Sequence, residues 1–509
     1  MGTEEVVAGG GGESSAEPGL PRALPMPAAA ALVFVAAGAV LMLEILAVRL
    51  LAPYVGLTLE TTTSIIGAAL GGIALGAAVG GYFADRTNTY LLIVGLLIGG
   101  GLLTLLTVPV VHWLGPGARG DGDAAALGIT VVALVPAAAV LSAVSPAVAH
   151  LQLHDLRASG TIVGRLSAWA TAGALIGTFG TGFVLVPLLP VDTAVLLIGA
   201  VLVAIGLGLA AASPLVSIAA VAGIALVAVA FGALTVSADS PCERQSKYHC
   251  LSLVADRERP DSFELLLDDA YNSYADASDP THLDYAYTRW IAEAIDRRYP
   301  GRRPLDAVFV GGGALTLPRW LDATHPGSRS QVLEVDEEIV DLVETRLDLP
   351  PEPAVQVSIG DARVTMLDLP TGSADVVVGD AYSGYTVPWH LTTEEWAEEV
   401  ERVLKPRGFY AVNLIDYPPF DFVKAEAKTL FGSFEDVEFA AYLGADEEPA
   451  GGNLVMFAAG RPLPWLVHSK RAQSEGVVTF DDSVVRPFAA GAEVLRDDFA
   501  PVDQLRSLG

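Results

Sequence analysis

Cysteine is nearly absent from this sequence, whose 509 residues include only Cys242 and Cys250. Two thiols are too few for a structural zinc site, and we predict no metal centre. Both lie within the segment 240–250, so one disulfide across a short turn is feasible in an oxidising compartment. Two reduced thiols are the alternative, because the sequence alone does not fix the separation of the two Cα atoms.

Basic residues are also scarce, with 30 Lys and Arg against 59 Asp and Glu. Residues 1–238 hold 6 basic and 11 acidic residues, and residues 239–509 hold the remaining 24 and 48. Nucleic acids and anionic lipid headgroups both need Lys or Arg to neutralise their phosphates. We therefore exclude nucleic acid and anionic headgroups as main partners.

Only five of the basic residues are lysine. An acidic, arginine-rich surface suits high salt, where screening weakens the repulsion between its carboxylates. We therefore predict a halophilic host. Equal stability of the soluble half at about 0.1 M and at multimolar salt would contradict this prediction.

The amino terminus lacks a basic stretch followed by an apolar core, since residues 1–27 are acidic and rich in Gly, Pro and Ser. We expect a disordered tail there and no cleavable signal peptide. Long apolar runs are abundant in residues 28–238, and each is long enough to cross about 30 Å of hydrocarbon as a helix. The seven runs cover residues 28–52, 62–84, 89–111, 124–149, 161–187, 191–211 and 214–236.

No polar face recurs through these runs, which argues against a buried core of soluble helices. We predict a multi-pass α-helical domain in the cell membrane, with the lipid bilayer as its partner. Arg86, Arg157 and Arg165 place two loops inside by the positive-inside rule. Seven spans then leave the second half of the chain outside the cell. This conflicts with the cofactor site predicted below for that half, because such a cofactor is made in the cytosol. Either a span is miscounted or the domain is external, and a disulfide would support the external side.

Two features of the apolar runs point to packing or function. Small residues at four-residue spacing predict helix contact faces, with Gly67, Gly71, Gly72, Gly76 and Gly80 in the second run and Gly173 and Gly177 in the fifth. Glu44 lies deep in the first run, where an ionisable group is costly unless it is paired or faces a polar cavity. We expect a functional role for Glu44.

From about residue 248 the pattern changes to short β-rich segments. Tyr248–Ala255 and Ser262–Leu267 predict a small β-hairpin unit, and Tyr285–Arg298 predicts a helix that links it onward. We assign residues 239–300 to this unit.

A cofactor-type α/β domain is expected over residues 301–465, followed by a carboxy-terminal extension over 466–509. The run Leu305–Val310 predicts a buried parallel strand, and it ends in Gly311, Gly312 and Gly313 before a helix through Trp320. A strand, a glycine turn and a helix let the backbone approach a ligand closely, with helix amides pointing toward it.

Acidic residues follow the next three strands. Glu334 and Asp336 end the second strand 21 to 25 residues after the glycines, where a carboxylate can accept hydrogen bonds from ribose hydroxyls. Asp361 with Ala362 follows Val355–Ile359, and Asp380 ends the fourth strand. Ligands bind at the carboxyl edge of open α/β sheets, so we predict a binding site there rather than a set of solvated strand ends.

The segment of about 245–460 resembles the spermidine synthase (polyamine aminopropyltransferase) family, and the whole chain looks like its fused membrane-bound relatives. The matching motifs are Leu267-Asp-Asp269, Gly311-Gly-Gly313, Leu333-Glu-Val-Asp336, Gly360-Asp361 and Asp380-Ala-Tyr-Ser383. The resemblance implies a Rossmann-like methyltransferase fold that uses decarboxylated S-adenosylmethionine. By this resemblance Glu334 would hold the ribose hydroxyls, Asp361 and Ala362 would lie against the adenine, and Asp380 would orient or deprotonate the attacking amine.

The departures from the family pattern concern the acceptor. Ala314 and Ser383 stand where the family has carboxylates, Thr288 follows Tyr287 where Gln is usual, and Asn272 also replaces Gln. A polycation needs several carboxylates to replace its hydration, so these losses should weaken or abolish putrescine binding.

His390 lies shortly after Asp380 and is either a base or a cap of the helix that Thr392 or Thr393 begins. We therefore predict aminopropyl transfer from decarboxylated S-adenosylmethionine to a small-molecule amine, with Tyr287, His390 and Asn272 on the acceptor side. The alternatives are an S-adenosylmethionine-dependent methyltransferase, and a membrane transporter or sensor that binds a nucleoside or polyamine without turnover. A homodimer is possible by analogy alone.

Overall fold

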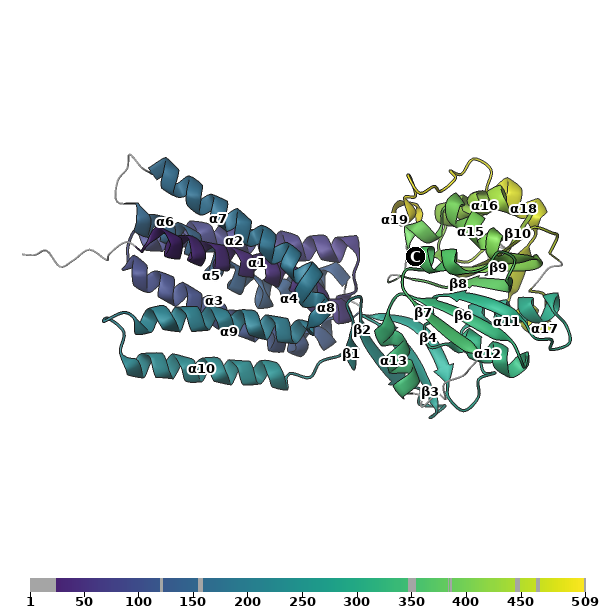
Figure 1. Cartoon of the computed structure of the whole chain (residues 1–509), viewed down its shortest axis with the longest axis horizontal. Helices are drawn as coiled ribbons and strands as arrows, with labels where there is room; N and C mark the ends of the chain where they lie inside the picture. Colours follow the sequence, from purple (N-terminus) through teal and green to yellow (C-terminus); the bar gives the residue numbers. More distant parts are fainter. Residues whose placement is uncertain are drawn as a thin grey trace, which may run out of the picture. The chain divides into compact units, whose positions relative to one another are not determined.

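The computed structural model describes residues 24–119, 122–153, 159–346, 354–382, 384, 387–444, 449–463 and 467–507. The chain divides into two compact units. The first comprises Met1–Leu51 and Thr58–Asp239, and the second comprises Ala52–Leu57 and Ser240–Gly509. Figure 1 labels most of their elements.

The elements of the first unit within the described residues are helices. Among its described residues, seven helical segments are long and apolar enough to cross a membrane, in agreement with the seven predicted runs. The helices are α1 (Met26–Val55), α2 (Leu59–Ala84), α3 (Thr89–Leu114), η1 (Gly115–Ala118), α4 (Gly122–Ala133), α5 (Val135–Ser142), α6 (Val144–Gln152), α7 (Ser159–Gly180), the π-turn η3 (Thr181–Leu185), α8 (Val186–Leu188), α9 (Val191–Ala211) and α10 (Ile218–Ser237). The expected tail 1–27 overlaps the start of α1, and its first 23 residues lie outside the described part of the chain.

The fourth run was wrongly predicted as one helix over 124–149. It is divided among α4, α5 and α6, and the segment long enough to span is Val135–Gln152. Pro136 lies in the first turn of α5, where it has no N–H to donate to the preceding turn, so the helix restarts there. Proline therefore moved the start of this candidate span by eleven residues while the number of spans stayed at seven.

The predicted glycine faces are confirmed in part. A Cβ at Gly72 would lie 3.1 Å from the Val135 side chain, and one at Gly76 or Gly80 would overlap the backbone of the facing helices. Gly173 and Gly177 pack in the same way against α1. A Cβ at Gly67 or Gly71 would meet no atom of the described residues within 4 Å, so their assignment to a contact face within this chain was wrong.

The second unit begins with an antiparallel sheet of four strands in the order β1-β2-β3-β4. The strands are β1 (Arg244–Gln245), β2 (Cys250–Ala255), β3 (Ser262–Leu267) and β4 (Ala270–Asp276). The sequence predicted only the β2–β3 hairpin. It missed β1 because two residues carry no periodic signal, and β4 because polar residues interrupt its alternation.

The larger sheet has eight strands in the order β12-β10-β11-β9-β8-β5-β6-β7. Strands β9, β8, β5, β6 and β7 are parallel, and β10 to β12 pair antiparallel. This is a methyltransferase-like Rossmann domain. Its strands are β5 (Asp306–Val310), β6 (Arg329–Glu334), β7 (Val355–Ile359), β8 (Ala374–Gly379), β9 (Leu404–Asp416), β10 (Asp436–Tyr442), β11 (Gly452–Ala459) and β12 (Val477–Phe480).

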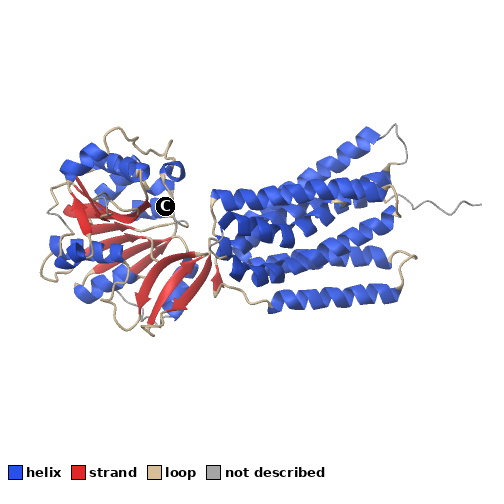
Figure 2. Cartoon of the chain, turned by 180° about the vertical axis from the view of Figure 1, so that it is seen from behind, coloured by secondary structure: helices blue, strands red, loops and turns tan. Residues whose placement is uncertain are grey.

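Helices cover both faces of this sheet (Figure 2). Successive residues of β9 alternate between two apolar cores, with Phe409 in one and Tyr410 in the other. Trp290 of α11 belongs to the first core and Trp396 of α15 to the second. The helices are α11 (Ala286–Arg298), α12 (Thr316–Thr324), α13 (Glu337–Arg346), α14 (Ala362–Thr365), η4 (Met366–Asp368), η5 (Trp389–Leu391), α15 (Glu394–Val403), α16 (Asp421–Ser433), α17 (Lys470–Ser474), α18 (Asp482–Phe488) and α19 (Val502–Leu505).

The segment 466–509 is not a separate extension. Its strand β12 pairs with β10 and so becomes the edge of the larger sheet. Val485, Leu495 and Val502 are buried in the second core. The boundary expected at residue 465 therefore cuts through one domain.

Candidate active site

The turn between β5 and α12 is shaped by glycine. Gly311 has a φ of 96°, in the left-handed region, and a Cβ there would overlap the backbone of Asp380. The turn therefore passes directly over the end of β8. The backbone N–H of Gly312 donates to Glu334 Oε2 at 2.6 Å, which joins the turn to the end of β6.

Glu334 is almost completely buried at the end of β6. Its second oxygen accepts a hydrogen bond from the backbone N–H of Asp336 at 3.0 Å. Burial raises the pKa of Glu334, and the hydrogen bonds from Asp336 and Gly312 act in the opposite direction. Each carboxylate oxygen can accept a further bond, so Glu334 is able to receive hydrogen bonds from a vicinal diol such as a ribose.

Asp336 is buried beside Glu334 and faces the turn between β1 and β2. Its Oδ2 accepts a hydrogen bond from Ser246 Oγ at 2.5 Å, and its Oδ1 accepts one from the Glu338 N–H. Burial raises the pKa of Asp336, partly offset by the Ser246 hydroxyl.

Asp361 follows β7 and caps the short helix α14 by accepting a hydrogen bond from the Arg363 N–H at 2.9 Å. Its Oδ1 lies 3.2 Å from His390 Nε2, while Ala362 is buried beside it. Thr393, not His390, caps α15 by accepting from the Trp396 N–H. The capping alternative for His390 was therefore wrong, and its contact with Asp361 puts it on the side predicted for the cofactor.

Asp380 comes directly after β8. Its Oδ2 accepts a hydrogen bond from the Tyr287 hydroxyl at 2.8 Å and its Oδ1 accepts one from Asn413 Nδ2 at 2.9 Å. Asn413 is held in turn by Asn453 Nδ2, which donates to its Oδ1 at 2.9 Å. Burial raises the pKa of Asp380 to about 7, although the bonds from Asn413 and Tyr287 favour the ionised form.

Two cavities meet at Asp380. The larger, of about 600 Å³, is within the range of small-molecule sites. Its lining includes Asn272, Gly311, Gly313, Glu334, Asp336, Asp361, Ala362, Asp380 and His390. The smaller, of about 30 Å³, is lined by Tyr287 and Gly312 and shares Asn272, Gly311, Gly313 and Asp380 with the larger. Every predicted site residue therefore lines one of the two cavities, and their individual roles stay predictions.

The acceptor-side replacements do not supply other charges. Ala314 is buried in the apolar core, and its N–H donates to Ser273 Oγ. The Thr288 hydroxyl donates to the Tyr285 carbonyl of its own helix at 2.7 Å. Ser383 lies outside the described residues.

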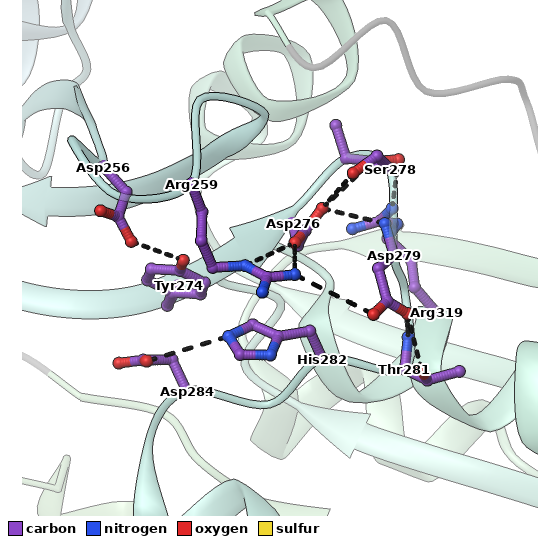
Figure 3. Close-up of polar contacts among 11 residues, drawn as sticks. Asp256, Arg259, Tyr274, Asp276, Ser278, Asp279, Thr281, His282, Asp284 and Arg319 are labelled. Atoms are coloured by element: carbon purple, nitrogen blue, oxygen red, sulfur yellow. Dashed lines mark hydrogen bonds and ion pairs between the residues drawn. The ribbon is translucent and has the colours of Figure 1, made fainter.

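Two residues that line the smaller cavity, Tyr274 and Asp284, belong to a group of polar contacts (Figure 3). The Tyr274 hydroxyl donates to Asp256, and Arg259 forms an ion pair with the buried Asp276. Burial raises the pKa of Asp276, but the hydrogen bonds from Arg259, Ser278 and the Asp279 N–H together outweigh it, so the pKa is lowered. This network fixes part of the cavity wall without filling the space.

Sequence reasoning missed Asn413, Asn453 and Ser246. Asn413 interrupts the apolar run 409–415 and Asn453 directly precedes the apolar run 454–459, and these polar positions were the one available signal. Their contacts to one another depend on the pairing of β9 with β11, which a local pattern does not reveal.

No family model matches the chain. A polyamine aminopropyltransferase of Vibrio vulnificus is 24% identical over 224 residues, which cover 40% of this chain and 71% of that protein. A polyamine aminopropyltransferase of Chromobacterium violaceum is 23% identical over 141 residues, covering 28% of this chain and 53% of that protein. A probable spermidine synthase of Corynebacterium glutamicum has a solved structure that is 27% identical, covers 50% of this chain and 95% of its own, and has a TM-score of 0.46. Over part of its length the chain is therefore similar in sequence to polyamine aminopropyltransferases, and this sequence identity supports a spermidine synthase-like protein.

Proposed function

We propose that the second unit transfers an aminopropyl group from decarboxylated S-adenosylmethionine to an amine. The observation that carries this proposal is the position of Asp380, which lies where the two cavities meet and has a pKa of about 7. A group with such a pKa is substantially ionised at neutral pH and can still accept and release a proton.

The larger cavity fits an S-adenosyl compound. Glu334 offers acceptor oxygens to ribose hydroxyls, and Asp361 with Ala362 would border the base. The acidic lining favours a cationic sulfonium over a neutral or anionic ligand. When bound, this co-substrate supplies the electrophilic carbon, and the residues of the chain bind and orient it.

Asp380 would act on the acceptor. An amine is protonated at neutral pH, and it must lose a proton before its lone pair can form the new N–C bond. The C–S bond then breaks with its electron pair on sulfur. Asp380 would hold the ammonium, take its proton and release that proton to solvent, while Tyr287 and Asn413 keep the carboxylate oriented.

Calorimetry on the full-length protein in detergent tests the cofactor site, with decarboxylated S-adenosylmethionine, S-adenosylmethionine and methylthioadenosine as ligands. We expect binding of decarboxylated S-adenosylmethionine and methylthioadenosine, weakened in Glu334→Ala, and turnover with an amine that Asp380→Asn abolishes. Turnover of S-adenosylmethionine with methyl transfer would favour the methyltransferase instead. Absence of binding to all three ligands would refute the site.

A second candidate function is a membrane transporter or sensor that binds a nucleoside or an amine without turnover. The observation in its favour is the poor acceptor side, where Ala314 and Thr288 present no charge and the cavity has about 30 Å³. Nucleoside binding with no product from any amine would support this function, and product formation would refute it.

We also propose that the helical unit anchors the protein in the cell membrane. Ile218, Leu226 and Val236 of α10 are largely exposed, as expected for side chains that face lipid. The protein should remain with membranes after an alkaline wash, and its release into the supernatant would contradict the proposal.

The Cys242–Cys250 disulfide favours a location of the second unit outside the cell, because disulfides persist in oxidising compartments. Intact cells treated with a membrane-impermeant reductant and then an impermeant thiol reagent should label both cysteines. Labelling only after lysis would place the second unit inside.

A further inference from the structure

The two cysteines form a disulfide that closes a small loop. Cys242 and Cys250 are joined with their Cα atoms 5.2 Å apart, so the alternative of two reduced thiols was wrong. Within the loop, β1 pairs with β2 through only two residue pairs, Arg244 with Leu251 and Gln245 with Cys250. The turn is closed by the Ser246 N–H, which donates to the His249 carbonyl at 2.9 Å. We refer to residues 243–249 as the disulfide loop.

The disulfide loop forms part of the wall of the larger cavity. Lys247, Tyr248 and His249 all line it, together with Glu334, Asp336 and Asp361 from the sheet edge. His249 Nδ1 lies 2.7 Å from Asp268 Oδ2, which ties the end of the loop to the β3–β4 turn. The loop therefore adds a wall that the Rossmann domain does not supply.

The same loop is bonded to the segment that follows β6. Ser246 Oγ accepts the N–H groups of Tyr248 and His249 and donates to Asp336 Oδ2 at 2.5 Å. Arg244 forms ion pairs with Glu338, at 3.1 Å, and with Asp341 on α13. Ser246 is thus a positioning residue that acts on the cavity through Asp336.

A two-residue strand contributes too few ladder bonds to order a loop by itself. Closing the loop with a disulfide removes much of the conformational freedom that an open segment would have. For a ligand that binds only when the wall is ordered, the apparent dissociation constant is the intrinsic one divided by the fraction of time that the wall is ordered.

We propose that the Cys242–Cys250 disulfide holds this wall in its binding arrangement, so that its redox state sets the affinity of the larger cavity for an S-adenosyl ligand. This inference rests on the proposed function, because it concerns the same cavity. In the reductive step a dithiol gives two electrons and two protons to the disulfide, the Sγ–Sγ bond breaks to two thiols, and the dithiol closes to its own disulfide.

The test uses the full-length protein in detergent and methylthioadenosine as the probe. Reduction with dithiothreitol should raise the dissociation constant roughly tenfold, as expected if the wall is ordered about a tenth of the time without the disulfide. Reoxidation should restore it. The double variant Cys242→Ser/Cys250→Ser should bind as the reduced protein does and should not respond to dithiothreitol. Arg244→Ala should weaken binding while the disulfide remains intact.

Equal affinity of the oxidised and the fully reduced protein, with both thiols verified by alkylation, would overturn the inference. Hydrogen exchange provides a readout that needs no ligand, because reduction should lower the protection of residues 243–249 and 334–341. Unchanged protection would overturn the inference even if no nucleoside binds. If protection falls but neither redox form binds methylthioadenosine, the proposed function fails and the claim about affinity fails with it.

Discussion

The two sides of the site hold their carboxylates in different ways. On the cofactor side, Glu334 and Asp361 accept hydrogen bonds from backbone N–H groups, whose positions the glycine turn and a helix start determine. On the acceptor side, Asp380 accepts hydrogen bonds only from the side chains of Tyr287 and Asn413 among the contacts described for it. These backbone donors hold the carboxylate oxygens of Glu334 and Asp361 in fixed positions, where they can accept hydrogen bonds from neutral hydroxyls. Burial raises the pKa of Asp380 to about 7 although its two side-chain donors act in the opposite direction, and a pKa near neutrality suits a group that exchanges a proton.

The largest expected effect concerns Asp380. We expect Asp380→Asn to lower kcat by about 10³-fold or more, because an amide cannot take the proton of the acceptor. The dissociation constant of methylthioadenosine should change little, since Asp380 belongs to the acceptor side. Steady-state turnover and calorimetry on the same preparation measure both quantities. If Asp380→Asn keeps the turnover of the parent protein, Asp380 is not the base and the base does not lie on the acceptor side as the comparison has it.

Glu334→Ala should have the opposite signature. It removes two charge-assisted hydrogen bonds and leaves the Gly312 and Asp336 N–H groups unpaired, so methylthioadenosine should bind about 10- to 100-fold more weakly. The exposed Glu337 nearby offers a matched control, and Glu337→Ala should leave binding unchanged. If Glu334→Ala and Glu337→Ala bind methylthioadenosine equally well, Glu334 does not contribute to the cofactor site.

Tyr287→Phe should change the pH dependence more than the maximal rate. The rate should rise with pH through about 7 in the parent protein, as Asp380 becomes ionised. The Tyr287 hydroxyl favours the ionised form, so its loss should raise the pKa and move this limb about one unit toward higher pH. Tyr285→Phe is the control, because no contact described for its hydroxyl reaches Asp380. If the rise of the rate with pH occurs at the same pH in Tyr287→Phe, the Tyr287 hydroxyl does not affect the pKa of Asp380.

Asp380 also links stability to pH. Its pKa is raised from 3.8 in the unfolded chain to about 7 in the folded protein, so the folded state binds the extra proton between these values. Its contribution to the free energy of unfolding is therefore full below about pH 4 and is lost as the pH rises through about 7. Asp380→Asn should reduce the change of the thermal unfolding midpoint of the second unit with pH across this range. An unchanged pH dependence would contradict the raised pKa of Asp380.

The sequence predicted which strand ends line the larger cavity, because the residues there follow directly from the ends of parallel strands, while their roles stay predictions. Strand β7 was predicted to the residue, and Glu334 and Asp361 follow from the rule that parallel strands end at one edge. Asn413 and Asn453 could not be predicted in the same way, because Asn413 reaches Asp380 through the pairing of β9 with β8 and Asn453 reaches Asn413 through the antiparallel pairing of β11 with β9. Ser246 was missed for a similar reason, since its partner Asp336 is 90 residues away in the chain.

The smallest expected effect concerns Asp284, the second carboxylate that lines the smaller cavity. Its side chain is about half exposed, so an ammonium beside it would remain partly hydrated and gain little. We expect a diamine to be preferred over a monoamine of the same length by less than about tenfold in kcat/KM, and Asp284→Asn to remove that preference. Asp279→Asn, which alters an exposed carboxylate in the same network but not in the cavity lining, is the control. A preference for the diamine of a hundredfold or more that survives in Asp284→Asn would mean that another carboxylate binds the second ammonium. The acceptor side would then hold more carboxylates than the comparison with the cofactor side allows.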